Sequence, residues 1–197
     1  MKRFFLTFLF FGFLFFNFSY SAFAKENSSL DLSDLKQRAF AYYATGNYKE
    51  AGKILEDFPK SEKDETIYLI LSNIAQENND DNLAISNLNR ALDKNYSFYK
   101  AYYNLGCIFA SKKSYLLALN NFELAIKYNK AFAPAYYNLA NCQMILKDFK
   151  SAKKNLIKAL ELEPNNKDAV YNLAYCYKQL NQIKNAKKTL EVYNKMP

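Results

Sequence analysis

The chain has 197 residues, with 27 Lys and Arg against 19 Asp and Glu, and it contains neither histidine nor tryptophan. The absence of histidine removes the commonest general base and the commonest metal ligand, which disfavours catalysis and metal binding. Charge is uneven along the chain: residues 25–146 hold 14 basic and 14 acidic residues, whereas residues 147–197 hold 11 lysines and 5 acidic residues.

Residues 1–24 have the three parts of a secretory signal peptide. Two basic residues precede an apolar run over residues 4–20, and a small-x-small motif ends at Ala24. We expect cleavage after Ala24, a short flexible tail over residues 25–31, and export. A retained membrane anchor is the alternative, because the apolar run approaches the roughly 20 residues that span a bilayer. The Asn- and Lys-rich composition is typical of an AT-rich bacterial genome and favours a periplasmic or envelope location.

A sequence repeat follows the polar tail. Residues 101–106, 135–140 and 169–174 read Ala-Tyr-Tyr-Asn-Leu-Gly, Ala-Tyr-Tyr-Asn-Leu-Ala and Ala-Val-Tyr-Asn-Leu-Ala, each 34 residues after the last. Alanines recur at the same spacing further along each unit: Ala84, Ala118, Ala152 and Ala186, with Ala51 one unit earlier. A repeat of this length indicates stacked supersecondary units. Five units result, starting near residues 32, 65, 99, 133 and 167.

Within each unit, apolar residues recur at intervals of three and four, the period of a helix buried on one face. Short polar breaks, such as residues 111–114, divide each unit into two helices. One position in the first helix is always small and lets the two helices approach closely: Ala39, Ser72, Gly106, Ala140 and Ala174.

These residues resemble the tetratricopeptide repeat, and the resemblance covers nearly all of the chain after the tail. The third unit carries its signature residues at Tyr102, Leu105, Gly106, Phe109, Tyr115, Ala118, Phe122 and Ala125. The resemblance implies an all-α fold, a right-handed α-α solenoid of about five helix-turn-helix units over residues 32–197. The last helix has a polar coat that includes Gln182, Lys184 and Lys188, so we expect the solenoid to end there.

Three cysteines lie at nearly equivalent positions of successive units: Cys107, Cys142 and Cys176. Stacked helices lie about 8–10 Å apart, whereas a disulfide needs Cα atoms within about 7 Å. We therefore expect free, buried cysteines that fill the core. Paired ligands at the short spacing of a zinc site are absent.

In tetratricopeptide repeats, fixed positions of each first helix line a concave groove. The resemblance therefore implies a partner-binding groove lined by Asn73, Tyr103, Asn104, Tyr137, Asn138, Asn141, Tyr171, Asn172 and Tyr175. Asparagine both donates and accepts, so we expect Asn104, Asn138 and Asn172 to face solvent and to bind a peptide backbone. The alternative is that these residues only fill the solenoid. The family's basic clamp for a carboxylate is missing, because only Lys36 and Lys100 are basic in this set.

Lysines gather on the second helices of the last two units, at spacings that place each set on one helical face: Lys150, Lys153, Lys154, Lys158, Lys184, Lys187 and Lys188. One interpretation is a solvated convex face. The functional interpretation is a stripe that contacts an anionic membrane surface or an acidic protein. Nucleic acid is disfavoured by export.

These features predict a noncatalytic protein–protein interaction scaffold in the bacterial envelope, which binds a peptide or a partner helix in its concave groove. The alternative is a structural assembly factor for outer-membrane or surface complexes, docking through larger surfaces that include the convex basic face. Neither hypothesis requires a cofactor. An enzyme is not expected, because no nucleophile–base pair, Gly-rich phosphate loop or metal-ligand spacing occurs.

Overall fold

The computed structural model describes residues 32–196, in which every regular element is a helix and no strand occurs. The expected signal peptide and tail lie outside these residues. Contacts within the chain divide it between Lys63 and Asp64 into two compact units, each of which is described by itself.

The first unit contains one helix pair. Residues 32–44 are helical, and α2 spans Tyr48–Asp57. Gly46, in the turn between them, has a φ of 79°, in the left-handed region that glycine tolerates best. Ala39, Ala51 and Leu55 are fully buried between the two helices, so the small positions of the repeat pattern form the contact here as expected.

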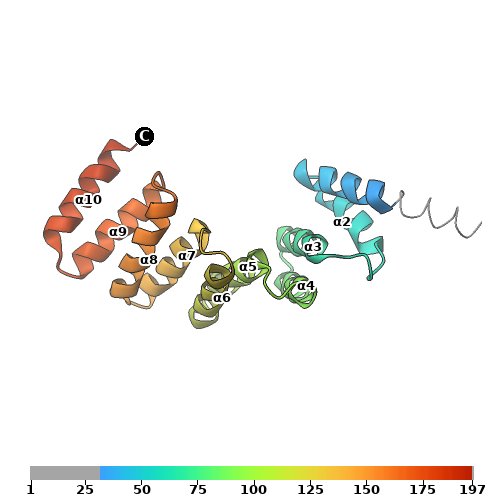
Figure 1. Ribbon diagram of the computed structural model, residues 1–197, viewed down its shortest axis with the longest axis horizontal. Helices are drawn as coiled ribbons and strands as arrows, with labels where there is room; N and C mark the ends of the chain where they lie inside the picture. The colour runs from blue at the N-terminus through green and yellow to red at the C-terminus, as the bar shows by residue number, and fades with distance from the viewer. Residues whose placement is uncertain (1–31, 197) are drawn as a thin grey trace, which may run out of the picture. The chain divides into compact units, whose positions relative to one another are not determined.

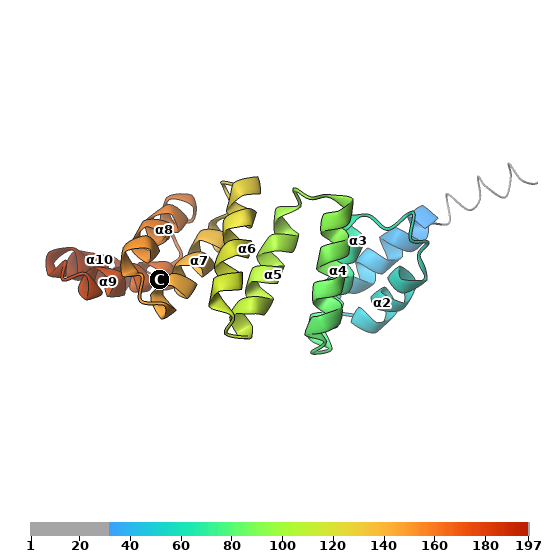
Figure 2. The same cartoon turned by 90° about the horizontal axis from the view of Figure 1, so that it is seen from below.

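The second unit contains four helix pairs, α3 to α10, which follow one another in chain order (Figure 1). The first helices of the pairs are α3 (Glu65–Glu77), α5 (Tyr99–Ser111), α7 (Ala133–Ile145) and α9 (Lys167–Gln179). The second helices are α4 (Asp81–Lys94), α6 (Tyr115–Tyr128), α8 (Phe149–Leu162) and α10 (Ile183–Lys195). Figure 2 shows α5 and α6 lying side by side as one such pair. The first helices begin at the residue numbers expected for units two to five.

Local sequence explains where several helices begin. The Asp64 carboxylate accepts from the backbone N–H groups of Thr66 and Ile67 at the start of α3, at 3.1 and 2.9 Å. Asn166 caps α9 in the same way, and a proline stands in the first turn of α7. The Asp64 and Asn166 side chains accept from backbone N–H groups that a helix N-terminus otherwise leaves unpaired. The proline of α7 has no N–H group, so no donor is left unpaired at its position.

The turn inside each pair of the second unit has one recurring geometry. Its left-handed residue is not glycine but Asn79, Lys113, Lys147 or Asn181, with φ between 57 and 64°. In the pair α5 and α6, the third along the chain, the Ser114 N–H donates to the Phe109 carbonyl at 2.8 Å, which caps the end of α5. The same reversal therefore recurs at one position of each pair.

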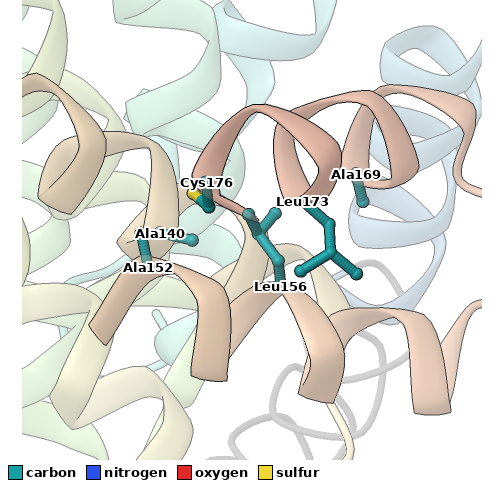
Figure 3. Close-up of a cluster of buried hydrophobic side chains, with 6 residues drawn as sticks. All are labelled: Ala140, Ala152, Leu156, Ala169, Leu173 and Cys176. Atoms are coloured by element: carbon teal, nitrogen blue, oxygen red, sulfur yellow. The ribbon is translucent and has the colours of Figure 1, made fainter. Parts of the chain in front are cut away.

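The pairs pack through small residues. Ala118, Ala152 and Ala140 are fully buried, as the repeat pattern predicts. Figure 3 shows how α7, α8 and α9 meet: Ala140, Ala152, Leu156, Ala169, Leu173 and Cys176 form one buried cluster. The pair α7 and α8 therefore closes its core by packing against α9, the first helix of the next pair.

The sequence predicts a run of repeats over residues 32–197, and the contacts within the chain divide this range at Lys63. The connection between α2 and α3 covers residues 58–64 and includes Pro59. The connections between later pairs are shorter, over residues 95–98, 129–132 and 163–166. The connection between α2 and α3 is therefore three residues longer than the later ones.

Candidate functional site

The predicted groove residues lie on the first helices of the pairs in the second unit. Asn73 is on α3, Tyr103 and Asn104 are on α5, and the rest are on α7 and α9. The structure brings these residues close together, and most of their asparagine side chains pair with a side chain on the neighbouring first helix.

Asparagine side chains connect successive first helices. The Asn104 amide Nδ2 donates to the Asn73 Oδ1 at 2.8 Å, between α5 and α3. The Asn172 Nδ2 donates to the Asn141 Oδ1 at 2.9 Å, between α9 and α7. All four residues are half-buried. Asn104 and Asn172, which the sequence places facing solvent, are therefore only partly exposed, and each is close enough to pair with the preceding repeat.

The interface between α5 and α7 uses different partners. The Asn138 Nδ2 donates to the Tyr103 hydroxyl oxygen at 3.0 Å and lies 3.8 Å from the Cys107 sulfur. The Tyr103 ring also packs against Phe122 and Phe132, with ring centroids 5.9 and 5.0 Å apart. Burial, with the neighbouring Cys107, raises the pKa of Tyr103 to about 12. Asn138 is likewise only partly exposed and pairs with the preceding repeat, and the Tyr103 ring packs against neighbouring aromatic rings.

The tyrosines expected in the groove differ in how accessible they are. Tyr137 is half-buried against the cluster of Figure 3. Tyr171 and Tyr175 on α9 are 52% and 41% exposed. A ligand can reach the tyrosines of the last pair much more readily than those of the third and fourth.

A cavity of about 330 Å³ lies where α5, α6 and α7 meet. Its apolar lining comes from Ala110, Tyr115, Phe122 and Ile145, and Asn138 and Asn141 add their amide groups. Ile145 is 55% exposed, although it stands where the third pair has Ser111. Sequence reasoning missed this cavity. The available signal was an isoleucine at the last position of α7, where the equivalent residue of α5, Ser111, is polar.

The cysteines are free, as expected. Cys142 and Cys176 are buried, and burial raises the pKa of each thiol to about 11. Cys107 is half-buried and lines the cavity together with Cys142, and burial raises its pKa as well. The core-filling prediction is confirmed for Cys142 and Cys176, whereas Cys107 also borders open space.

The lysine stripe is not uniform. Lys153 is half-buried: its Nζ donates to the Gln182 Oε1 at 3.3 Å and lies 5.7 Å from the centre of the Tyr177 ring. Lys158 pairs with Glu161 at 2.9 Å, and the interaction raises its pKa. The remaining members of the stripe are exposed: Lys150, Lys154, Lys184, Lys187 and Lys188.

Three of these lysines share a second cavity. Lys153, Lys154 and Lys158 line a space of about 610 Å³ together with Tyr136, Ile157 and Glu161. With three ammonium groups and one carboxylate, this surface of α8 favours an anionic partner.

Within residues 32–196, no three His, Cys, Asp or Glu side chains gather as metal ligands. No helix in this part of the chain has both the length and the hydrophobicity to span a membrane.

Comparisons with known proteins agree with this architecture. Two tetratricopeptide repeat family profiles match the chain, one over residues 99–132 and the other over residues 144–195. No curated protein sequence matches the chain.

Several solved structures are similar across most of their length. "MamA RS-1 ArsTM double mutant" has a TM-score of 0.73 at 20% identity, covering 82% of this chain and 92% of that one. "MamA AMB-1 P212121" has a TM-score of 0.71 at 19% identity, covering 84% and 91%. Identity this low establishes a shared fold only. The family matches, the recurring helix pairs and the shared fold agree: the chain is a tetratricopeptide repeat protein.

Proposed function

We propose that this protein is a noncatalytic scaffold in the bacterial envelope that binds an extended peptide or a partner helix on the side formed by its first helices. The cavity between α5, α6 and α7 is the observation that carries the proposal. It lies beside Asn138 and Asn141, at positions that line the groove in this family, and it is lined mostly by apolar side chains.

The cavity suits an apolar side chain flanked by backbone. Its volume of about 330 Å³ is at the lower end of the range for ligand pockets, about 300–1,000 Å³. The side-chain oxygen of Asn141 accepts from Asn172. The amide hydrogens of Asn141 have no partner among the described residues. A peptide can therefore insert one apolar side chain and offer a backbone carbonyl to Asn141.

A photoreactive amino acid in place of Ile145 tests the proposal. Crosslinking in the native organism, followed by mass spectrometry, should identify one partner segment with an apolar residue at the crosslink. Ile145→Glu should weaken binding of that synthetic segment, measured by titration calorimetry, because a carboxylate would have to be desolvated in the cavity. The matched control is Leu116→Glu on α6, where the leucine is 71% exposed and outside the cavity lining. Equal affinities for the two variants would place the partner elsewhere.

The envelope location rests on residues 1–24 and is tested separately. N-terminal sequencing of the chain from the envelope fraction should begin at Lys25. Recovery of the uncleaved chain in the membrane pellet would favour the anchor instead.

A second candidate function is a structural assembly factor that docks through the basic surface of α8 and α10. The cavity lined by Lys153, Lys154 and Lys158 favours it. Binding to an acidic partner or to anionic vesicles should then fall steeply with salt. It should also be lost when Lys153, Lys154, Lys187 and Lys188 are changed together to glutamate, while Ile145→Glu has no effect. The reverse pattern of losses would favour the groove.

A further inference from the structure

The last helix pair, α9 and α10, leaves uncovered a face that the preceding pair covers. In the fourth pair Leu156 is fully buried; the equivalent Leu190 of the fifth pair is 38% exposed. Ile183, which corresponds to the half-buried Phe149, is 46% exposed. Tyr171 of α9, which corresponds to the half-buried Tyr137 of the fourth pair, is 52% exposed. Apolar residues that occupy the core in one pair are therefore accessible in the next.

The fourth pair shows what kind of object fits this face. There α9 covers it, and Ala169, Leu173 and Cys176 pack against Leu156 and Ala152 (Figure 3). Small side chains at two of those three positions let the helix backbone come close. The equivalent face of the last pair therefore has the shape that receives a helix with an apolar stripe.

The polar residues of α10 lie beside this face and leave its apolar residues exposed. Residues turn by about 100° each around a helix, so side chains three and four apart are neighbours. Lys187 follows Ile183 by four and precedes Leu190 by three, which places it at the edge of the apolar stripe. On α9, Lys178 follows Tyr171 by seven and borders the stripe from the other helix. Both lysines are exposed.

Charge selects among the helices that could bind here. Besides Lys187, α10 carries Lys184, Lys188 and Lys195, with Glu191 as its only acidic residue. In the internal interface Lys153 contacts the neutral side chains of Gln182 and Tyr177. The uncovered face instead has an excess of positive charge at its border, which an acidic partner would complement.

The same charges disfavour a second copy of this chain. Two such faces meeting symmetrically would bring both sets of lysines together. A head-to-tail contact would use the helix over residues 32–44, where Asp34 and Arg38 stand exposed. These correspond to Ile67 and Leu71, which are buried in α3. That helix therefore offers a polar surface and not an apolar stripe.

We propose that the face formed by Tyr171, Ile183 and Leu190, bordered by Lys178 and Lys187, binds an amphipathic helix of another protein that carries acidic residues beside its apolar stripe. This surface is separate from the cavity between α5, α6 and α7, so the chain has two distinct docking sites.

The test uses the full chain and a pair of stapled helical peptides of the length of α9. Both keep Ala, Leu and Ala at the spacing of Ala169, Leu173 and Cys176; one has glutamates along the stripe and its twin has lysines. In fluorescence anisotropy the glutamate peptide should bind about tenfold more tightly than the lysine twin, a difference of about 1.4 kcal/mol. Lys178→Glu combined with Lys187→Glu should reverse the order.

Substitutions then locate the binding. Leu190→Glu should abolish binding of the glutamate peptide, while Leu116→Glu, at another exposed leucine, and Ile145→Glu, in the cavity, should leave it unchanged. Circular dichroism should show that all three variants keep their helices. Equal affinity for the two peptides, or undiminished binding to Leu190→Glu, would overturn the proposal. Concentration-dependent dimerisation of the chain that Leu190→Glu abolishes would also overturn it, in favour of a second copy.

Discussion

In the third helix pair Gly106 faces the ring of Phe122, and a Cβ added to that glycine would lie 2.6 Å from the ring Cε1. In the fourth pair the equivalent residues are Ala140 and Leu156, which share one buried cluster. The two pairs follow the same repeat but distribute side-chain volume differently between the same two positions. The comparison teaches that side-chain volume at these two positions is coupled: a smaller residue on the first helix goes with a larger one on the second.

The two pairs also differ in how their first helices connect. Asn172 of α9 donates to Asn141 of α7, whereas Asn138 of α7 donates to the hydroxyl of Tyr103 on α5. The cavity lies beside the second of these interfaces. The cavity therefore lies at the interface of α5 and α7, where an asparagine pairs with a tyrosine and not with another asparagine.

The largest expected effect comes from overfilling the closest helix contact in both pairs. Ala118→Leu and Ala152→Leu should each lower the free energy of unfolding by about 1–3 kcal/mol or more, since both alanines are fully buried. Urea denaturation measures the change. Asn121→Leu on α6 is the control and should have little effect, because Asn121 is only half-buried and bonds locally to the Leu117 carbonyl. Comparable losses at all three positions would contradict the packing described here.

Exchange of volume between Gly106 and Phe122 tests the coupling directly. Gly106→Ala should destabilise the chain by about 1–3 kcal/mol, because the added methyl group meets the buried Phe122 ring. Phe122→Leu should recover much of that loss, since it recreates the Ala–Leu combination of the fourth pair. A double-mutant cycle gives the coupling energy, and additive effects would show that the two positions are independent.

Removal of the asparagine bridges should have a smaller effect. Asn104→Ala and Asn172→Ala should each cost about 0.5–1.5 kcal/mol, the net contribution of a neutral hydrogen bond. Asn138→Ala should lie at the upper end, because it removes the donor to the half-buried Tyr103 hydroxyl. Thermal and urea unfolding should both report the loss. Asn120→Ala, at an exposed position of α6, should be neutral.

The smallest expected effect lies in the turns. Lys147 has a φ of 64°, and replacing it with glycine relieves backbone strain but adds freedom to the unfolded chain. A net gain of about 0.5 kcal/mol is expected, with a similar gain for Lys113→Gly. Lys154→Gly, inside the exposed surface of α8, should instead destabilise by about 1 kcal/mol. Calorimetric melting temperatures would separate the two signs.

The sequence predicts the helix pairs well. The spacing of the alanines and of the large apolar residues along the chain is enough to show which residues meet inside each pair. Ala118 and Ala152 are buried where the pattern places them. The pairing of Asn104 with Asn73 was not predictable in the same way, because an asparagine at a groove position suits a ligand and a neighbouring repeat equally well. Only the distance between adjacent first helices decides between the two.

The division at Lys63 and the exposed face of the last pair are harder to predict from the residues. Residues 58–64 look like any other connection until their length is compared with the later ones. Leu190 matches Leu156 in the pattern, so the repeat predicts burial for both. Exposure depends on which other elements pack against the residue, which the residue type does not encode.

Helix packing in the second unit is mostly between neighbours in the chain, and α10 packs mainly on α9. Contacts of short sequence separation cost little loop-closure entropy, so we expect this unit to fold quickly for its size. Each pair depends on its neighbours for protection, and the end of such a stack opens first. Backbone amides in α10 should therefore exchange with deuterium faster than those in α5 and α7. A bound helix at the end of the stack would slow that exchange and spread protection inward.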